Sequence, residues 1–63
     1  MNIRYGLWAG KQGARYVLWQ TSNGYEVEQV WGIGSGVIFK ADTVRECKQF
    51  LNRECMAKRM THK

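Results

Sequence analysis

The chain is short and basic, and these two properties limit what it can be. It has 63 residues, with ten Lys or Arg against five Asp or Glu and a formal net charge of +5. Domains of this size bury only about 60% of the surface of the unfolded chain, so we expect one domain spanning residues 1–63, whose small core a homodimer would enlarge. The charge excess favours polyanions as partners, nucleic acid first and an anionic membrane surface second.

The sequence also predicts a location and excludes some chemistry. No apolar stretch approaches the roughly 20 residues of a spanning helix and the N-terminus has no signal-peptide pattern, so we expect a cytoplasmic protein without a membrane partner. Cys47 and Cys55 lie on the predicted C-terminal helix, separated by a rise of roughly 12 Å that no disulfide spans. We therefore expect two free core thiols and neither a metal site nor a cofactor.

Alternating apolar and polar residues predict three successive strands, at residues 3–8, 15–22 and 25–31. A turn at residues 9–14 joins the first two strands. Asn23-Gly24 joins the second and third, because both residues tolerate the positive φ of a type I′ turn. If Ser22 pairs with Tyr25 across that turn, the two strands form an antiparallel hairpin in a defined register.

A glycine-rich connection at residues 32–36 follows the third strand and leads to a short fourth strand at residues 36–40. We expect a flexible hairpin loop in which glycine supplies positive φ. The glycine spacing differs from the dinucleotide-binding fingerprint and a strand follows instead of a helix, so a phosphate-binding loop is not predicted. Pairing of this fourth strand with the third, with another edge or with another chain stays open.

Beyond the fourth strand the apolar period changes from two to about 3.6, which predicts an amphipathic helix at about residues 43–60. Thr43 followed by Glu46 fits a capping box, and Asp42 is an alternative cap. Lys58 and Arg59 then lie at the negative end of the helix dipole. The apolar stripe of this helix consists of Val44, Cys47, Leu51 and Cys55, with Phe50 beside it.

These elements together predict an α+β domain. A three- or four-stranded antiparallel β-meander, at about residues 3–40, is followed by one C-terminal helix that packs on one face of the sheet. In outline this order of elements resembles the sheet-plus-helix modules of tyrosine-recombinase arm-binding domains, which place a small sheet in a DNA groove. The resemblance rests on topology alone and implies a DNA-binding sheet.

The predicted register divides the sheet into two faces. With Trp8 opposite Arg15, the apolar face that the helix should cover consists of Ile3, Tyr5, Leu7, Tyr16, Leu18, Val27 and Trp31, with Val37 and Phe39 if the fourth strand continues in step. The other face carries Arg4, Gly6, Trp8, Arg15, Val17, Trp19, Glu28, Val30, Ile38 and Lys40. A surface that combines tryptophans, β-branched residues and bases is typical of an interaction site.

Three hypotheses concern the partner of this second face. The first is nucleic acid, DNA rather than RNA, bound as a single strand or through a duplex groove. Tryptophan rings would stack on or wedge between nucleobases, and Lys and Arg side chains would contact phosphates. The residues expected to bind are Arg4, Trp8, Arg15, Trp19, Lys40, Lys58 and Arg59. The second is a host protein docked on the same aromatic patch, and the third is a homodimer seam. Glu26 and Glu28 oppose the first hypothesis, because they place negative charge where phosphates would pass.

No catalytic constellation is evident, because the sequence pattern offers neither a pocket nor a base within one. We therefore expect a small non-enzymatic regulatory protein of phage or mobile-element type that binds nucleic acid. The alternative is an adaptor or inhibitor that docks on a host protein through the same patch.

Overall fold

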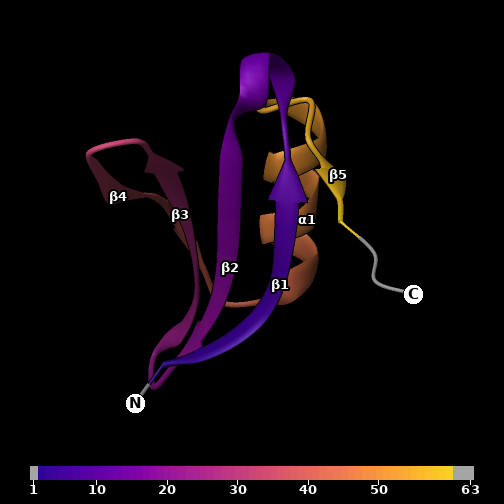
Figure 1. The fold of residues 1–63 in the computed structure, drawn as a ribbon. Helices are drawn as coiled ribbons and strands as arrows, with labels where there is room; N and C mark the ends of the chain where they lie inside the picture. The colour runs from indigo at the N-terminus through magenta and orange to yellow at the C-terminus, as the bar shows by residue number, and fades with distance from the viewer. Residues whose placement is uncertain (1, 61–63) are drawn as a thin grey trace.

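A computed structural model describes residues 2–60 and has a five-stranded antiparallel sheet with one helix packed on one of its faces (Figure 1). The elements in chain order are β1 (Ile3–Ala9), a 3-10 turn η1 (Lys11–Gly13), β2 (Arg15–Thr21), β3 (Gly24–Trp31), β4 (Gly34–Ala41), α1 (Val44–Arg53) and β5 (Lys58–Arg59). The strands lie in the order β4-β3-β2-β1-β5. The predicted α+β meander is confirmed, and β5 adds one strand to it.

The β2–β3 hairpin turns one residue earlier than predicted. Its loop is Ser22 and Asn23, and Thr21 pairs with Gly24. Positive φ occurs at Gly24, at 139°, and not at Asn23, so the predicted type I′ turn at Asn23-Gly24 is wrong. The register differs from the prediction by two residues, with Leu18 opposite Val27. Because side chains alternate with a period of two, this slip leaves each residue on its predicted face.

A β-bulge in β1 reverses the faces of half that strand. Arg4 pairs with Trp19 in the predicted register, Tyr5 is an extra residue, and Trp8 then lies opposite Tyr16 instead of Arg15. The predicted exposure of Trp8 is therefore wrong, since Trp8 turns to the helix side and only 5% of its surface is exposed. Leu7 turns the other way, onto the face that α1 leaves uncovered.

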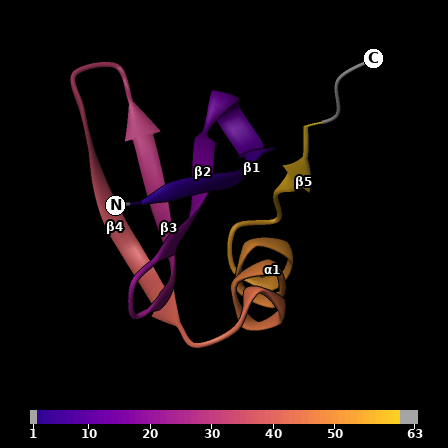
Figure 2. The same cartoon turned by 90° about the horizontal axis from the view of Figure 1, so that it is seen from below.

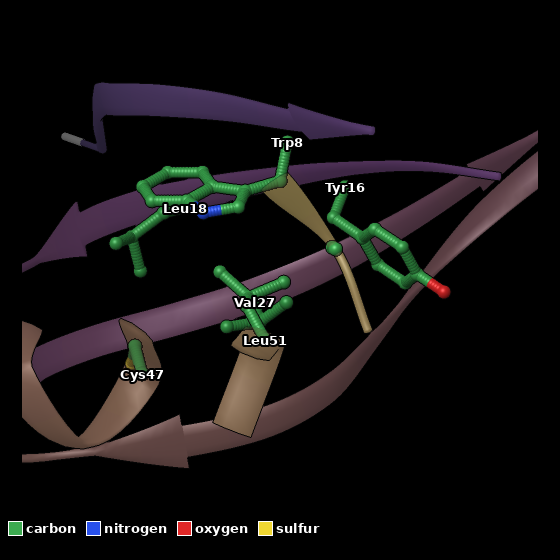
Figure 3. Close-up of a cluster of buried hydrophobic side chains, with 7 residues drawn as sticks. Trp8, Tyr16, Leu18, Val27, Cys47 and Leu51 are labelled. Carbon is green, nitrogen blue, oxygen red and sulfur yellow. The ribbon is translucent and has the colours of Figure 1, made fainter. Parts of the chain in front are cut away.

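The core lies between α1 and the central strands (Figure 3). Leu51 and Cys47 reach it from α1 and meet Leu18 and Val27 of the sheet, and all four are completely buried. Fully burying a leucine or valine side chain stabilises the fold by about 1.5–3 kcal/mol. The predicted apolar stripe is thus confirmed for Val44, Cys47 and Leu51, with Phe50 beside it, whereas Cys55 packs against the core from beyond the end of the helix. Beside this core the rings of Phe39 and Phe50 stack, with centroids 4.3 Å apart.

The helix begins as predicted and ends earlier. The backbone N–H of Glu46 donates to the Thr43 hydroxyl at 3.2 Å, and that hydroxyl donates to the Glu46 carboxylate at 3.1 Å. The helix ends at Arg53, and Met56, with a φ of 51°, turns the chain back. Ala57 packs into the core and its N–H donates to the Leu51 carbonyl at 2.9 Å. The predicted helix to about residue 60 is therefore wrong in its last part.

The segment after the helix adds to the sheet. Trp8 pairs with Arg59 and Ala9 pairs with Lys58, so β5 covers the end of the β1 edge. Lys58 and Arg59 belong to this strand and not to a helix, so their predicted place at the negative end of a helix dipole is wrong. Strand pairing satisfies backbone groups of β1, and this favours β5 over a longer helix.

The β3–β4 hairpin is longer and tighter than predicted. Its loop is Gly32 and Ile33 alone, and Trp31 pairs with Gly34. Ile38 is an extra residue, so Val37 lies opposite Glu28, away from the helix, and the prediction that Val37 joins the core is wrong. The hairpin end projects away from α1 and β5 in both views (Figures 1 and 2). Trp31, predicted as core, is consequently 47% exposed.

Candidate binding face

The sheet face that α1 leaves uncovered, called the open face below, consists of three rows of paired residues. The row nearest the β3–β4 loop is Lys58, Ala9, Arg15, Val30 and Ser35. The middle row is Leu7, Val17, Glu28 and Val37, and the far row is Arg4, Trp19, Glu26 and Lys40. The centre of the open face is therefore largely apolar, and two of its four basic residues, Lys40 and Lys58, stand on the edge strands β4 and β5.

Five of the seven predicted binding residues lie on the open face: Arg4, Arg15, Trp19, Lys40 and Lys58. The two others do not. Trp8 is in the core because of the bulge at Tyr5. Arg59 lies on the helix side, with its guanidinium carbon 5.4 Å from the centre of the Trp8 ring and 5.5 Å from that of the Tyr5 ring. These cation–π contacts give Arg59 a structural role.

Glu28 organises the centre of the open face. Its two carboxylate oxygens accept hydrogen bonds from separate donors, the Trp19 indole N–H at 2.7 Å and the Ser35 hydroxyl. The bond from Ser35, and after it the bond from Trp19, lowers the pKa of Glu28 below its usual range. The carboxylate is therefore ionised at neutral pH, and its hydrogen bonds hold the half-buried Trp19 ring in place across β2 and β3.

The hydrogen bonds of Glu28 reduce the repulsion of phosphates that Glu26 and Glu28 are expected to cause. Both oxygens of Glu28 are occupied within the sheet, so the carboxylate is neither bare nor bound to one of the bases. The side chains of Arg4, Arg15, Lys40 and Lys58 are all exposed, whereas Glu26 and Glu28 are half-buried. The basic groups are therefore more accessible to a partner than the two acids, and the open face presents four Lys or Arg side chains against two acids.

The spacing of the bases can be worked out from the register. Lys40 on β4 and Arg4 on β1 are three strands apart, which is roughly 14 Å at the usual strand separation. Arg15 and Lys58 are two strands apart, or roughly 10 Å. The major groove of B-DNA is about 12 Å wide, so Lys and Arg side chains at this separation can contact the phosphates on both sides of the groove.

Sequence reasoning missed four residues of the open face: Leu7, Ala9, Ser35 and Val37, of which Ala9 was assigned to a turn. Leu7 and Val37 each moved there through a bulge, and Ser35 was assigned to a loop instead of a strand. A signal existed for the first, because Gly6 stands inside an otherwise regular strand pattern and glycine at such a position often marks a bulge. Gly36, inside β4 two residues before Ile38, is a similar signal for the second bulge, but it was assigned to the glycine-rich loop connection.

The described residues offer little support for three other kinds of feature: a reactive thiol, a metal site and a membrane-spanning helix. Burial raises the pKa of both thiols, Cys47 and Cys55, so neither is an activated nucleophile. Within residues 2–60 no group of three or more His, Cys, Asp or Glu residues could hold a metal ion. Helix α1 is the only α-helix of this range, and it does not have the length or apolar character needed to cross a bilayer.

No protein-family model, no curated protein and no solved structure matches the chain.

Proposed function

We propose that the protein is a small non-enzymatic regulator, of phage or mobile-element type, that binds duplex DNA through the open face. The observation that supports this most directly is the set of four exposed bases around a half-buried, hydrogen-bonded Glu28. Arg4, Arg15, Lys40 and Lys58 contact phosphates, and Trp19 with its apolar neighbours approaches the groove between them.

Duplex DNA is favoured over a single strand by the tryptophan positions. Binding of single strands by base stacking uses several aromatic rings on one surface. Trp8 is buried, Trp31 lies on the helix side, and Trp19 is half-buried with its N–H bound to Glu28. One partly covered ring is a poor platform for stacking nucleobases, whereas the spacing of the Lys and Arg side chains suits a duplex groove of defined width.

Salt dependence of binding tests the proposal. Each neutralised phosphate contributes about −0.9 to the slope of log affinity against log salt, so four contacts predict a slope of roughly −3.6 and a hundredfold weakening between 50 and 200 mM salt. Fluorescence anisotropy with a labelled duplex measures this slope. Arg15→Gln and Lys58→Gln should each reduce its magnitude by about 0.9.

The matched control is Arg53→Gln, because Arg53 is also exposed but lies on α1, on the other side of the sheet. This variant should retain the full slope. The proposal is wrong if the wild-type protein does not bind duplex at low salt, or if Arg15→Gln and Lys58→Gln behave like Arg53→Gln.

A protein partner is the second candidate, and the apolar centre of the open face favours it. Val30 and Val37 are 38% and 48% exposed there, beside Leu7 and Val17. Such a partner would be insensitive to Arg15→Gln, and Trp19→Ala would be the severe change, because aromatic anchors dominate interface energies. The two variants therefore distinguish the candidates.

A further inference from the structure

The end of the β3–β4 hairpin, residues 30–35 and called the tip below, is the most exposed apolar part of the described chain. Ile33 is 98% exposed, and Trp31 beside it is 47% exposed. The stretch from Gln29 to Phe39 contains no charged residue, in a chain with a net charge of +5. The tip projects away from α1 and β5, so nothing in residues 2–60 covers Ile33 (Figures 1 and 2).

The glycines of the tip are not required by the fold. At Gly24 an added Cβ would lie 2.6 Å from a backbone oxygen, and at Gly6 it would lie 2.8 Å from the Trp8 ring. At Gly32 it would meet nothing within 4 Å, and at Gly34 its nearest neighbour would be 3.6 Å away. Neither tip glycine has a left-handed φ, so the prediction that these glycines supply positive φ is wrong.

Glycine therefore keeps the tip thin without serving the internal packing. Glycine at such positions lets a backbone approach another molecule closely. With Gly32 and Gly34 on either side, Ile33 is the one side chain of the loop apex. The Trp31 ring lies beside Gly34 and Gly36, at 3.5–3.6 Å from where their Cβ atoms would be. The result is a narrow ribbon that ends in one apolar side chain.

The tip also stands next to a base of the open face. Arg15 pairs with Val30 at the root of the tip, and Lys58 lies in the same row. Gly32 and Ile33 form the turn itself, so the apex of the tip lies about two residue steps beyond the Val30–Ser35 pair, a reach of roughly 7 Å. If Arg15 contacts the phosphate backbone that separates two grooves, the tip extends across that backbone. The absence of acidic residues at the tip removes any repulsion from the phosphates that it passes.

We propose that the tip is a wedge that enters the minor groove of duplex DNA and inserts Ile33 at a base step. The minor groove is only about 6 Å wide, which suits a loop with a single side chain. Apolar side chains inserted in this way unstack the step and kink the duplex by roughly 20–90°. This inference rests on the proposed function, because it requires the open face to hold the same duplex.

Bending of the duplex is the measurement that tests the wedge. A duplex of about 25 base pairs carrying a donor and an acceptor at its ends reports bending by energy transfer, and anisotropy on the same sample reports binding. The wild-type protein should raise the transfer efficiency. Ile33→Ser should bind roughly tenfold more weakly with an unchanged salt slope, and at saturation it should leave the transfer efficiency at the value of free duplex.

Thickening the tip is the second variant. Gly32→Val should fold normally, because a Cβ there meets nothing within 4 Å, and it should also abolish bending because the loop becomes too wide for the groove. Ile3→Ser is the matched control, since Ile3 is 58% exposed at the opposite end of the sheet. It should bend DNA like the wild-type protein.

The possible failures are distinguishable. If the wild-type protein does not bind duplex, the proposed function and the wedge are both wrong. If it binds without bending, or if Ile33→Ser and Gly32→Val bend the duplex normally, the wedge alone is wrong and the open face remains the DNA site. In that case a protein groove becomes the occupant to test for the tip.

Discussion

Replacing Gly24 by alanine is the sharpest test of the sheet geometry. Gly24 has a φ of 139°, a conformation that costs other residues about 1–3 kcal/mol. Its added Cβ would lie 2.6 Å from the carbonyl oxygen of Ala41, where β4 ends, and relieving such a backbone clash costs another 1–3 kcal/mol. Gly24→Ala should therefore lower the free energy of unfolding by about 2–6 kcal/mol.

For a domain of this size each kcal/mol shifts the melting temperature by about 4–8 °C, so a decrease of at least roughly 8 °C is expected. Far-UV circular dichroism during thermal and urea unfolding measures it. Gly32→Ala is the matched control and should change the free energy of unfolding by less than about 0.5 kcal/mol, because its Cβ meets nothing within 4 Å. Equal effects of the two substitutions would refute the close approach of Gly24 to Ala41.

Three further predictions concern the core and the titrating groups. Leu51→Ala should cost about 2–5 kcal/mol in urea unfolding, since Leu51 is completely buried, and the exposed Asn52→Ala should cost under about 0.5; similar losses would contradict the packing of α1. Hydrogen bonds lower the pKa of Glu28 in the folded state, so the stability they add is present above the usual pKa of 4.5 and is lost as pH falls through the lower folded value. The free energy of unfolding of Glu28→Gln should therefore fall less between pH 7 and pH 3 than that of the wild-type protein. An equal fall in both proteins would exclude Glu28 as the origin. Burial raises the pKa of Cys47 and Cys55, so both thiols should react slowly with a disulfide reagent at pH 7.5. Cys47 is completely buried and should react only when the protein unfolds. Equal reaction rates of the two thiols in the folded protein would argue against the burial of Cys47.

The faces of the sheet could be predicted wherever no bulge intervenes. Arg15, Val17 and Trp19 lie on the open face as predicted, because a two-residue error in the β2–β3 register preserves the alternation. A single bulge does not. Beyond Tyr5 each side chain of β1 is on the face opposite to the prediction, and both Leu7 and Trp8 are large and apolar, so composition could not reveal the exchange.

The end of the helix could not be predicted from local signals. Residues 54–60 contain neither glycine nor proline, and the apolar period continues through Cys55. Tertiary contacts end the helix instead, because Ala57 fills the core and β5 completes the edge of β1. Lys58 therefore reaches the open face through a strand pairing that no pattern in the sequence indicates.

The pairing of β5 with β1 also has a kinetic consequence. The first four strands are joined by short local hairpins, which close quickly. By contrast, the guanidinium of Arg59 donates to the backbone carbonyl of Tyr5 across 54 positions of the chain, a far more distant closure. We therefore expect the meander to form in the folding transition state and β5 to dock after it. Substitutions at Arg59 should then accelerate unfolding and leave the refolding rate nearly unchanged.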